Sequence, residues 1–368
     1  MNKNFKQAKS IAYLRQLCCS GLDRQIVIQE FLAAVKNVVP SDGNVFCDVE
    51  KQFAPTDFIS DFNIANHAEF MDITTAYWTL ARIMRFASWF MHQPVFTDPK
   101  MLDEKYYSSD FYRYSLNNFG QHRLLISQAL HLGRPIGMIT LQRSPDSANF
   151  NEYEQAVLVR LMPYVAHART AQQPPKDIVY CEQGTSGMMV MTSHGTVLYQ
   201  SQSAKKLLNL ASNPVININA AERKAALMAR LTQLCRNLDT IFRGEEAAPP
   251  SWCFVNGMGR FIFHACWLDA QAHEPNDLIG VTIEHQEPLL LKILRALEQL
   301  PLSPIQKEVA TLMAQGASNE TICQQLHIKL TTAKDHIRKI FIRLNIENRE
   351  QLLPKLMAGK QDRIIQLM

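Results

Sequence analysis

Three side chains with complementary hydrogen-bonding character lie close together near the C-terminal end of this 368-residue chain: Lys334, Asp335 and Arg338. The spacing of apolar residues predicts a helix from about residue 331 to 344. One face of that helix is apolar, formed by Ala333, Ile337, Ile340, Phe341 and Leu344. The three polar residues share the opposite face with Thr331. Lysine and arginine can donate to guanine O6 and N7, and a carboxylate can accept from cytosine N4, so this face is suited to reading base edges in a DNA major groove. Asp335 could equally hold Arg338 in place across one turn.

Basic residues flank this face and extend over the C-terminal fifth of the chain. His336, Lys339 and Arg343 lie where they could contact phosphates, which position a protein on DNA without specifying sequence. From Pro301 onward ten lysines and arginines face six acidic residues, an excess equal to the +4 of the whole chain. The first 300 residues are therefore formally neutral, and the local basic excess is typical of a nucleic-acid-binding module.

The elements that must position this helix have clear boundary signals. Ser303 and Gln306 form a predicted capping box around a proline, which starts a first helix, and Gly316 suits its end. Ser318 can cap a second helix that runs to about Leu326. A three-residue turn then leads into the basic helix. Two helices joined by such a turn predict a helix-turn-helix.

The same stretch resembles the LuxR-type (GerE-type) helix-turn-helix domain in order and without gaps. The matching residues are Leu302-Ser303, Glu308-Val309, Leu312, Gly316, Ser318-Asn319, Ile322, Leu326, Thr332 to His336, Ile340, Arg343-Leu344, Arg349 and Leu352. The resemblance implies that Lys334, Asp335 and Arg338 face the bases. It also implies phosphate contacts from Asn319, Lys329, Thr331, Thr332 and His336.

Several positions depart from the family pattern. Ile305-Gln306 replaces an Arg-Glu pair, so an internal ion pair is lost, while Thr321 replaces a glutamate and Lys329 the serine of the turn. Pro354 is expected inside the fourth helix, where a proline costs about 3 kcal/mol unless the helix bends or ends there. In the family, that helix commonly dimerises this domain.

The neutral region predicts an α+β multidomain chain. Residues 1–172 resemble a GAF domain, through two antiparallel strands joined at Gly133-Arg134 and a long helix from about Glu152. Residues 173–287 resemble a PAS domain through the segment GTVLYQSQSAKKLLNL. Residues 288–300 form a leucine-rich linker helix, and residues 301–368 form the helix-turn-helix domain. Both resemblances imply antiparallel sheets that sense ligands or mediate dimers.

An unusually aromatic segment spans residues 53–119. Six of its residues are candidates to line an apolar ligand pocket: Phe70, Tyr77, Trp78, Phe86, Trp89 and Phe90. Ordinary core and dimer interface is the favoured alternative, since aromatic side chains dominate both.

Other kinds of site lack support. The eight cysteines are scattered with no CxxC pair, which predicts reduced, mostly buried thiols, with a redox pair at Cys18-Cys19 as the alternative, and no metal site. No nucleophile elbow, P-loop or paired catalytic carboxylate is present in a credible setting, so we expect neither an enzyme nor a cofactor. The absence of a signal peptide or an apolar span predicts a cytoplasmic protein without membrane contact.

The sequence thus predicts a one-component transcriptional regulator that binds a pseudo-palindromic operator in double-stranded DNA as a homodimer. RNA polymerase is a candidate partner, and the helices at 152–172 and 288–300 are candidates for dimerisation. In the first hypothesis the N-terminal domains sense a small molecule. In the second they only dimerise, and protein level or a protein partner controls activity. An enzyme with an appended DNA-binding domain is the least favoured reading.

Overall fold

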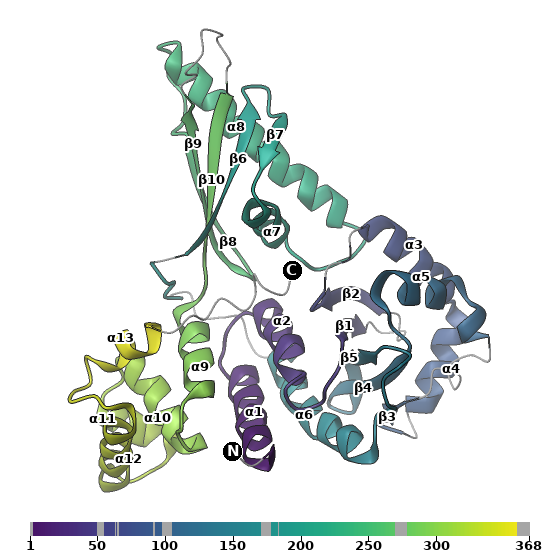
Figure 1. Cartoon of the computed structure of the whole chain (residues 1–368), viewed down its shortest axis with the longest axis vertical. Coiled ribbons are helices and arrows are strands. Elements are labelled where there is room, and N and C mark those ends of the chain that lie inside the picture. The colour runs from purple at the N-terminus through teal and green to yellow at the C-terminus, as the bar shows by residue number, and fades with distance from the viewer. Residues whose placement is uncertain are drawn as a thin grey trace.

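The computed structural model describes residues 3–49, 55–62, 64, 66–90, 93–97, 105–170, 178–182, 184–268 and 278–358. Two antiparallel sheets with flanking helices precede a C-terminal group of short helices (Figure 1). The predicted α+β multidomain fold is confirmed.

The N-terminal segment forms two helices, α1 (Lys3–Cys18) and α2 (Arg24–Val35). They separate at Gly21, whose φ of +74° lies in the left-handed region that favours glycine. Asp23 then caps α2 by accepting a hydrogen bond of 2.8 Å from the backbone N–H of Gln25.

The first sheet has the strand order β2-β1-β5-β4-β3, with every neighbouring pair antiparallel. Its strands are β1 (Gly43–Val49), β2 (Pro55–Ser60), β3 (Val95–Phe96), β4 (Arg123–His131) and β5 (Arg134–Arg143). The predicted hairpin of β4 and β5 is confirmed. Its turn lies at Leu132-Gly133, one residue earlier than expected, because both residues have positive φ.

Helices cover both faces of this sheet. Phe46, Leu125 and Ile139 point toward α2 and α6 (Glu152–Thr170). Cys47, Ile126 and Met138 point to the other face, which packs against the aromatic segment. That segment forms α3 (His67–Tyr77), α4 (Leu80–Phe90), a 3-10 turn (Tyr106–Ser108) and α5 (Asp110–Phe119). Successive strand residues therefore serve two separate cores, as the pleat requires.

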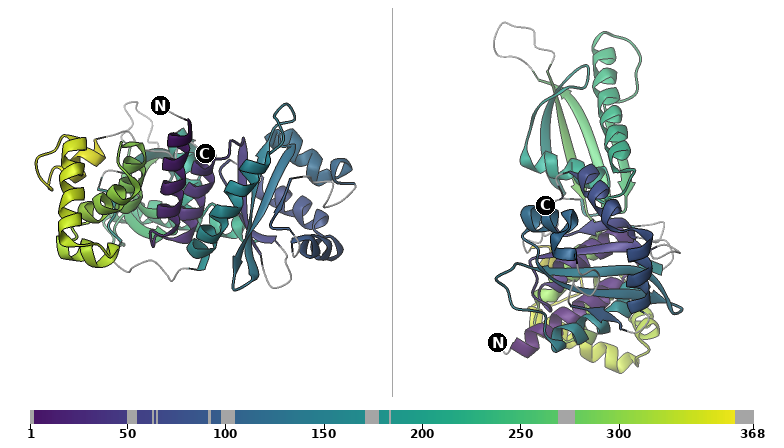
Figure 2. Two further views of the ribbon diagram at one scale, coloured as in Figure 1. Left: turned by 90° about the horizontal axis from the view of Figure 1, so that it is seen from below. Right: turned by 90° about the vertical axis from the view of Figure 1, so that its right-hand side faces the viewer.

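The second sheet, β7-β6-β10-β9-β8, has the same topology as the first and projects away from the rest of the molecule (Figures 1 and 2). Its strands are β6 (Thr185–Thr192), β7 (Val197–Gln200), β8 (Ser251–Asn256), β9 (Gly259–Trp267) and β10 (Leu278–Gln286). Helices α7 (Gln202–Ala211) and α8 (Ala220–Phe242) pack on one face.

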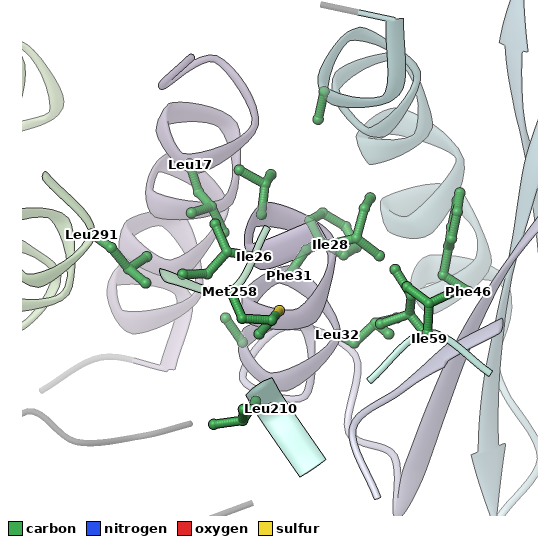
Figure 3. Close-up of a cluster of buried hydrophobic side chains, with 14 of the residues drawn as sticks. Leu17, Ile26, Ile28, Phe31, Leu32, Phe46, Ile59, Leu210, Met258 and Leu291 are labelled. Atoms are coloured by element: carbon green, nitrogen blue, oxygen red, sulfur yellow. The ribbon is translucent and has the colours of Figure 1, made fainter. Parts of the chain in front are cut away.

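A continuous core joins the two sheet units and the helix that follows them (Figure 3). Leu17 and Ile26 of the N-terminal helices gather there with Leu210 of α7, Met258 of the β8–β9 turn and Leu291 of α9 (Leu289–Gln299). A backbone bridge adds to this contact, since Phe58 of β2 and Ile216 exchange two hydrogen bonds of 2.8–2.9 Å.

The C-terminal helices are α10 (Pro304–Ala314), α11 (Asn319–Leu326), α12 (Leu330–Leu344) and α13 (Leu352–Met357). Their core includes Ile293 and Leu297 of α9, whose Leu291 and Leu294 belong to the core of the sheet units. The linker helix is therefore buried on both sides.

The described residues were also compared with what a membrane span, a metal site or a redox pair of cysteines would need. No helix among them is long and apolar enough to cross a bilayer, and no group of histidine, cysteine and acidic side chains in them could hold a metal ion. None of the eight cysteines, all of which lie in the described residues, forms a disulfide. Only four are buried, namely Cys18, Cys47, Cys181 and Cys235. Burial raises the pKa of Cys18 and of Cys19, which disfavours the thiolates that a redox pair needs.

Candidate nucleic-acid interface

The predicted boundary signals of the helix-turn-helix are confirmed. Gln306 N donates to Ser303 Oγ (3.4 Å), and Ser303 N donates to Gln306 Oε1 (3.0 Å), which completes the capping box around Pro304. Gly316 follows α10 with a φ of +84°. Ser318 caps α11 by accepting from Thr321 N at 3.1 Å. Local chemistry therefore sets the ends of both supporting helices.

Helix α12 carries the apolar and polar faces that its sequence predicted. Its apolar side packs inward, with Ala333, Ile340 and Leu344 buried and Ile337 and Phe341 half-buried. It begins at Leu330, one residue earlier than expected, after a turn in which His327 adopts a φ of +52°. The packing fixes the rotation of the helix and so decides which side chains face solvent.

The candidate base-reading residues share the exposed side of α12. Lys334, Asp335 and Arg338 are all exposed, as is Thr331 at the start of the helix. Within the described part of the chain Lys334 and Arg338 form no hydrogen bond or ion pair. Two cationic donors one turn apart are thus free to meet a ligand.

Asp335 has a different partner from the one considered from the sequence. Lys339 Nζ lies 2.6 Å from Asp335 Oδ2, while no bond joins Asp335 to Arg338. This hydrogen bond holds the pKa of Asp335 below its ordinary value. Asp335 was expected to contact a base and Lys339 a phosphate. In the structure they instead form an ion pair with each other on the surface of α12.

Arg343 also has an internal contact that its sequence position did not indicate. Its Nη1 donates to Gln306 Oε1 at 2.6 Å and to Pro301 O at 3.1 Å. The contact ties the end of α12 to the start of α10. The neutral amide of Gln306 thus accepts a hydrogen bond from the Arg343 guanidinium, at a position where the family pattern has a glutamate.

The remaining candidate phosphate residues surround the exposed face. Lys329, Thr331 and Thr332 are exposed around the N-terminal end of α12, where unpaired backbone N–H groups favour anions. His336 is half-buried, and its Nδ1 has no hydrogen-bond partner.

An open hollow of about 820 Å³ brings together residues of α10, α11, α12 and the segment that follows α12. Asn319 of α11 lines it with Lys334 and Arg338 of α12. Three amide side chains that follow α12, which we did not predict, also line the hollow: Asn345, Asn348 and Gln351. The density of amide side chains between 345 and 351 was the signal available in the sequence.

Pro354 lies inside the fourth helix, as predicted, but the expected cost does not arise. Helix α13 begins at Leu352, so Pro354 is its third residue. Backbone N–H groups of a first turn have no partner within the helix, so proline removes no hydrogen bond there.

The helix-turn-helix region packs against α1. This contact leaves the exposed face of α12 uncovered. Gln16 Nε2 of α1 donates to Thr311 Oγ1 of α10 at 3.1 Å, and Lys9 Nζ donates to Leu300 O at 3.3 Å. Helices α11 and α12 lie on the side away from α1 in Figure 1, and the left view of Figure 2 shows the same separation of the yellow and purple helices. The candidate interface is therefore accessible in this arrangement.

The aromatic candidates lie together on the far face of the first sheet. Phe70, Trp78 and Phe86 line a cavity of about 80 Å³ there. Tyr77 packs behind them, with its ring stacked 4.8 Å from that of Phe111, and Trp89 is half-buried 5.8 Å from Phe96. The side chain of Phe90 lies outside the described residues. The segment provides ordinary core as well as a cavity wall.

Comparison with known proteins identifies the class of the C-terminal region. Residues 300–355 match the family described as bacterial regulatory proteins, luxR family. These residues form a LuxR-type helix-turn-helix domain, as predicted. The monoamine regulon transcriptional regulator of Klebsiella aerogenes is 33% identical over 66 residues, which are 18% of this chain and 29% of that protein. The chain thus spans less than a third of the length of this relative.

Solved structures of LuxR-type receptors resemble the chain more remotely. VqmA of Vibrio cholerae, in a complex with ligand and DNA, is 16% identical with a TM-score of 0.23, covering 50% of this chain and 88% of that one. The phage VqmA–DPO complex is 16% identical with a TM-score of 0.18, covering 47% and 81%. Scores this low indicate little overall structural agreement.

Proposed function

We propose that this chain is a one-component transcriptional regulator that binds double-stranded DNA through α12. The observation that carries the proposal is the pair of unpartnered cationic side chains, Lys334 and Arg338, exposed one turn apart on the second helix of a LuxR-type helix-turn-helix. A major groove admits one helix, and bidentate donation to guanine is the commonest specific contact.

The surrounding residues take positioning roles in this proposal. Asp335 reads a base or orients its neighbours through its bridge to Lys339. The phosphate contacts come from Asn319, Lys329, Thr331, Thr332, His336, Lys339 and the remaining donors of Arg343. Such contacts set register and orientation without specifying sequence.

The regulator acts as a homodimer on a pseudo-palindromic operator. Two recognition helices related by a two-fold axis would meet half-sites about one helical turn apart. The N-terminal units supply dimer contacts and sense a small molecule, which shifts the balance between two dimer arrangements by preferring one of them. Such a protein works in the cytoplasm with RNA polymerase as a partner, and we assign it no catalytic activity.

The test is selection of a duplex from a random pool with the full chain, followed by titration of the selected and a scrambled sequence. Lys334→Ala should cost about 1–3 kcal/mol on the selected sequence and relax its preference. Lys205→Ala, which removes an exposed lysine from α7, is the matched control and should leave both affinities unchanged. Failure to enrich any sequence, or equal losses from the two variants, would overturn the proposal.

A further inference from the structure

The two sheets have four edge strands, and three of them are protected against pairing with another chain. An edge strand presents unpaired backbone groups, which proteins normally shorten, bend or cover. Phe58 of β2 is bridged to Ile216, β3 has two residues, and β7 has four residues and a register shift opposite Val190-Met191. Strand β8 has none of these protections. It pairs with β9 without a register shift and contains no charged residue or proline.

The backbone of β8 alternates between groups that bond to β9 and groups that point to the free edge. Residues of an antiparallel pair exchange hydrogen bonds at every second position. Ala265 N donates to Pro250 O at 2.8 Å, so the even-numbered residues of β8 bond to β9. Ser251, Cys253 and Val255 therefore direct their N–H and C=O groups outward, and no described residue bonds to those groups. Pro250 does not protect this edge, because the N–H that it lacks would have faced β9.

The side chains of β8 make this edge apolar on both faces of the sheet. Trp252 and Phe254 are half-buried and stacked, with ring centroids 4.5 Å apart. Arg230 of α8 lies over the Trp252 ring, so these aromatic side chains are on the face that carries α8. Cys253 and Val255 are exposed on the opposite face. A regular, uncharged and exposed edge of this kind is a template for an added strand.

The sequence of β8 is self-complementary about Cys253. If two copies of β8 run antiparallel with a two-fold axis at Cys253, Ser251 of one copy faces Val255 of the other. The outward backbone groups then meet each other, because they are placed symmetrically about the axis. Trp252 of one copy faces Phe254 of the other, and aromatic cross-strand pairs stabilise a sheet. A two-fold interface requires such a self-complementary patch.

The charges near β8 also permit two copies to pair. The row of side chains through the axis continues from Cys253 to Ile262 of β9 and Glu284 of β10. At about 4.8 Å between strands, the two copies of Glu284 would be about 24 Å apart. Arg260, opposite Val255, would lie about 14 Å from His264 of the second copy. Both separations exceed the Debye length of about 8 Å at physiological salt, so no strong repulsion opposes the pairing.

We propose that β8 pairs with β8 of a second copy of this chain, antiparallel and centred on Cys253, so that the two five-stranded sheets become one continuous sheet. The inference rests on the proposed function in that it identifies the dimer interface of the regulator. The linker helix α9, a candidate for that role from the sequence, is buried on both sides within one chain. Strand β8 takes its place.

Disulfide trapping tests the register of the two strands. Bonded partners in an antiparallel sheet have Cα atoms about 5.5 Å apart, which a disulfide can span. Oxidation of the full chain with copper phenanthroline should therefore produce a dimer linked through Cys253. Cys253→Ser should abolish the cross-link, while Cys266→Ser, which removes another exposed thiol of the same sheet, is the control and should retain it. No cross-link, or one that survives Cys253→Ser, would overturn the register.

Val255→Pro tests the backbone pairing. It removes an outward N–H that β9 does not use, and edge strands tolerate proline at such positions. In sedimentation velocity the wild type should be a dimer at micromolar concentration. Val255→Pro should raise the dimer Kd by at least about tenfold, because two symmetry-related hydrogen bonds are lost. Val255→Thr keeps the N–H and is the matched control, with an unchanged Kd.

Two results would overturn the interface. The first is an equal Kd for wild type and Val255→Pro. The second is a wild-type monomer. If the amides of β8 in such a monomer exchanged slowly with deuterium, another segment of the same chain would be the occupant of the edge.

Operator binding, measured on the same samples, separates this inference from the proposed function. If Val255→Pro dimerises like the wild type and binds the selected operator, the interface alone is overturned. A dimer linked through Cys253 that enriches no operator would overturn the regulator and leave the interface.

Discussion

Arg295 and Glu30 are 265 residues apart in sequence, yet Arg295 Nη2 lies 2.8 Å from Glu30 Oε2, and neither side chain is more than 2% exposed. Arg295 Nη1 also donates to both carboxylate oxygens of Glu287 at 3.0 Å. Tyr13 donates its hydroxyl proton to Glu30 Oε1 at 2.6 Å. The network connects α1 and α2 to the end of the second sheet and to the linker helix of the helix-turn-helix domain.

Arg295→Leu is expected to lower the free energy of unfolding by about 3–5 kcal/mol, because it leaves two buried carboxylates without their counter-charge. Urea denaturation of the full chain measures this loss. Arg243→Leu is the matched control: its pair with Asp239 has a 69% exposed guanidinium, and such pairs contribute about 0–1 kcal/mol. Equal losses would show that the buried network contributes no more than a surface pair.

Lys307 is expected to make stability rise with pH. Desolvation, aided by the charge of Lys9 and opposed by Glu298, lowers the pKa of Lys307 to about 8 from an ordinary 10.5. Between these values the unfolded chain holds a proton on this lysine that the folded chain has released, so the unfolding free energy increases with pH through this window. Denaturation of wild type and Lys307→Met between pH 7.5 and 10 checks it. The difference between their stabilities should shift in favour of wild type as pH rises, and a constant difference would contradict the assignment.

Lys339→Ala is expected to weaken the selected and scrambled duplexes alike and to reduce the slope of log K against log salt by about 1. The reason is that Lys339 contributes charge beside the groove face, while its Asp335 partner would remain as an uncompensated anion. Anisotropy titrations at several salt concentrations provide the slope. Lys334→Ala serves as comparison, since it should change sequence preference, and identical losses of specificity from both would refute the division of roles.

Gln306→Glu is expected to stabilise the helix-turn-helix by about 0.3–1 kcal/mol, because a carboxylate favours the first turn of α10. It would also form a charge-assisted bond with Arg343, which already lies 2.6 Å from Gln306 Oε1. Thermal and urea unfolding measure the gain. Adding Arg343→Met should remove part of it, and a gain that is independent of Arg343 would show that no ion pair forms.

Local signals in the sequence were enough to predict α10, α11 and α12 and the hairpin of β4 and β5. Caps such as Ser303 and Ser318 act within three residues, and the apolar spacing of α12 determines its buried face without reference to distant segments.

The contacts between individual side chains, both within α12 and between distant elements, were decided only by the tertiary structure. Asp335 has two cationic neighbours within reach along its helix, and only side-chain geometry selects Lys339 over Arg338. The aromatic spacing did not show that Trp78 faces the cavity while Tyr77 packs behind it, because helix rotation depends on what lies beneath. Arg295 meets Glu30 across most of the chain. No local pattern encodes such pairs, because their energies depend on burial that exists only once the separate elements have packed.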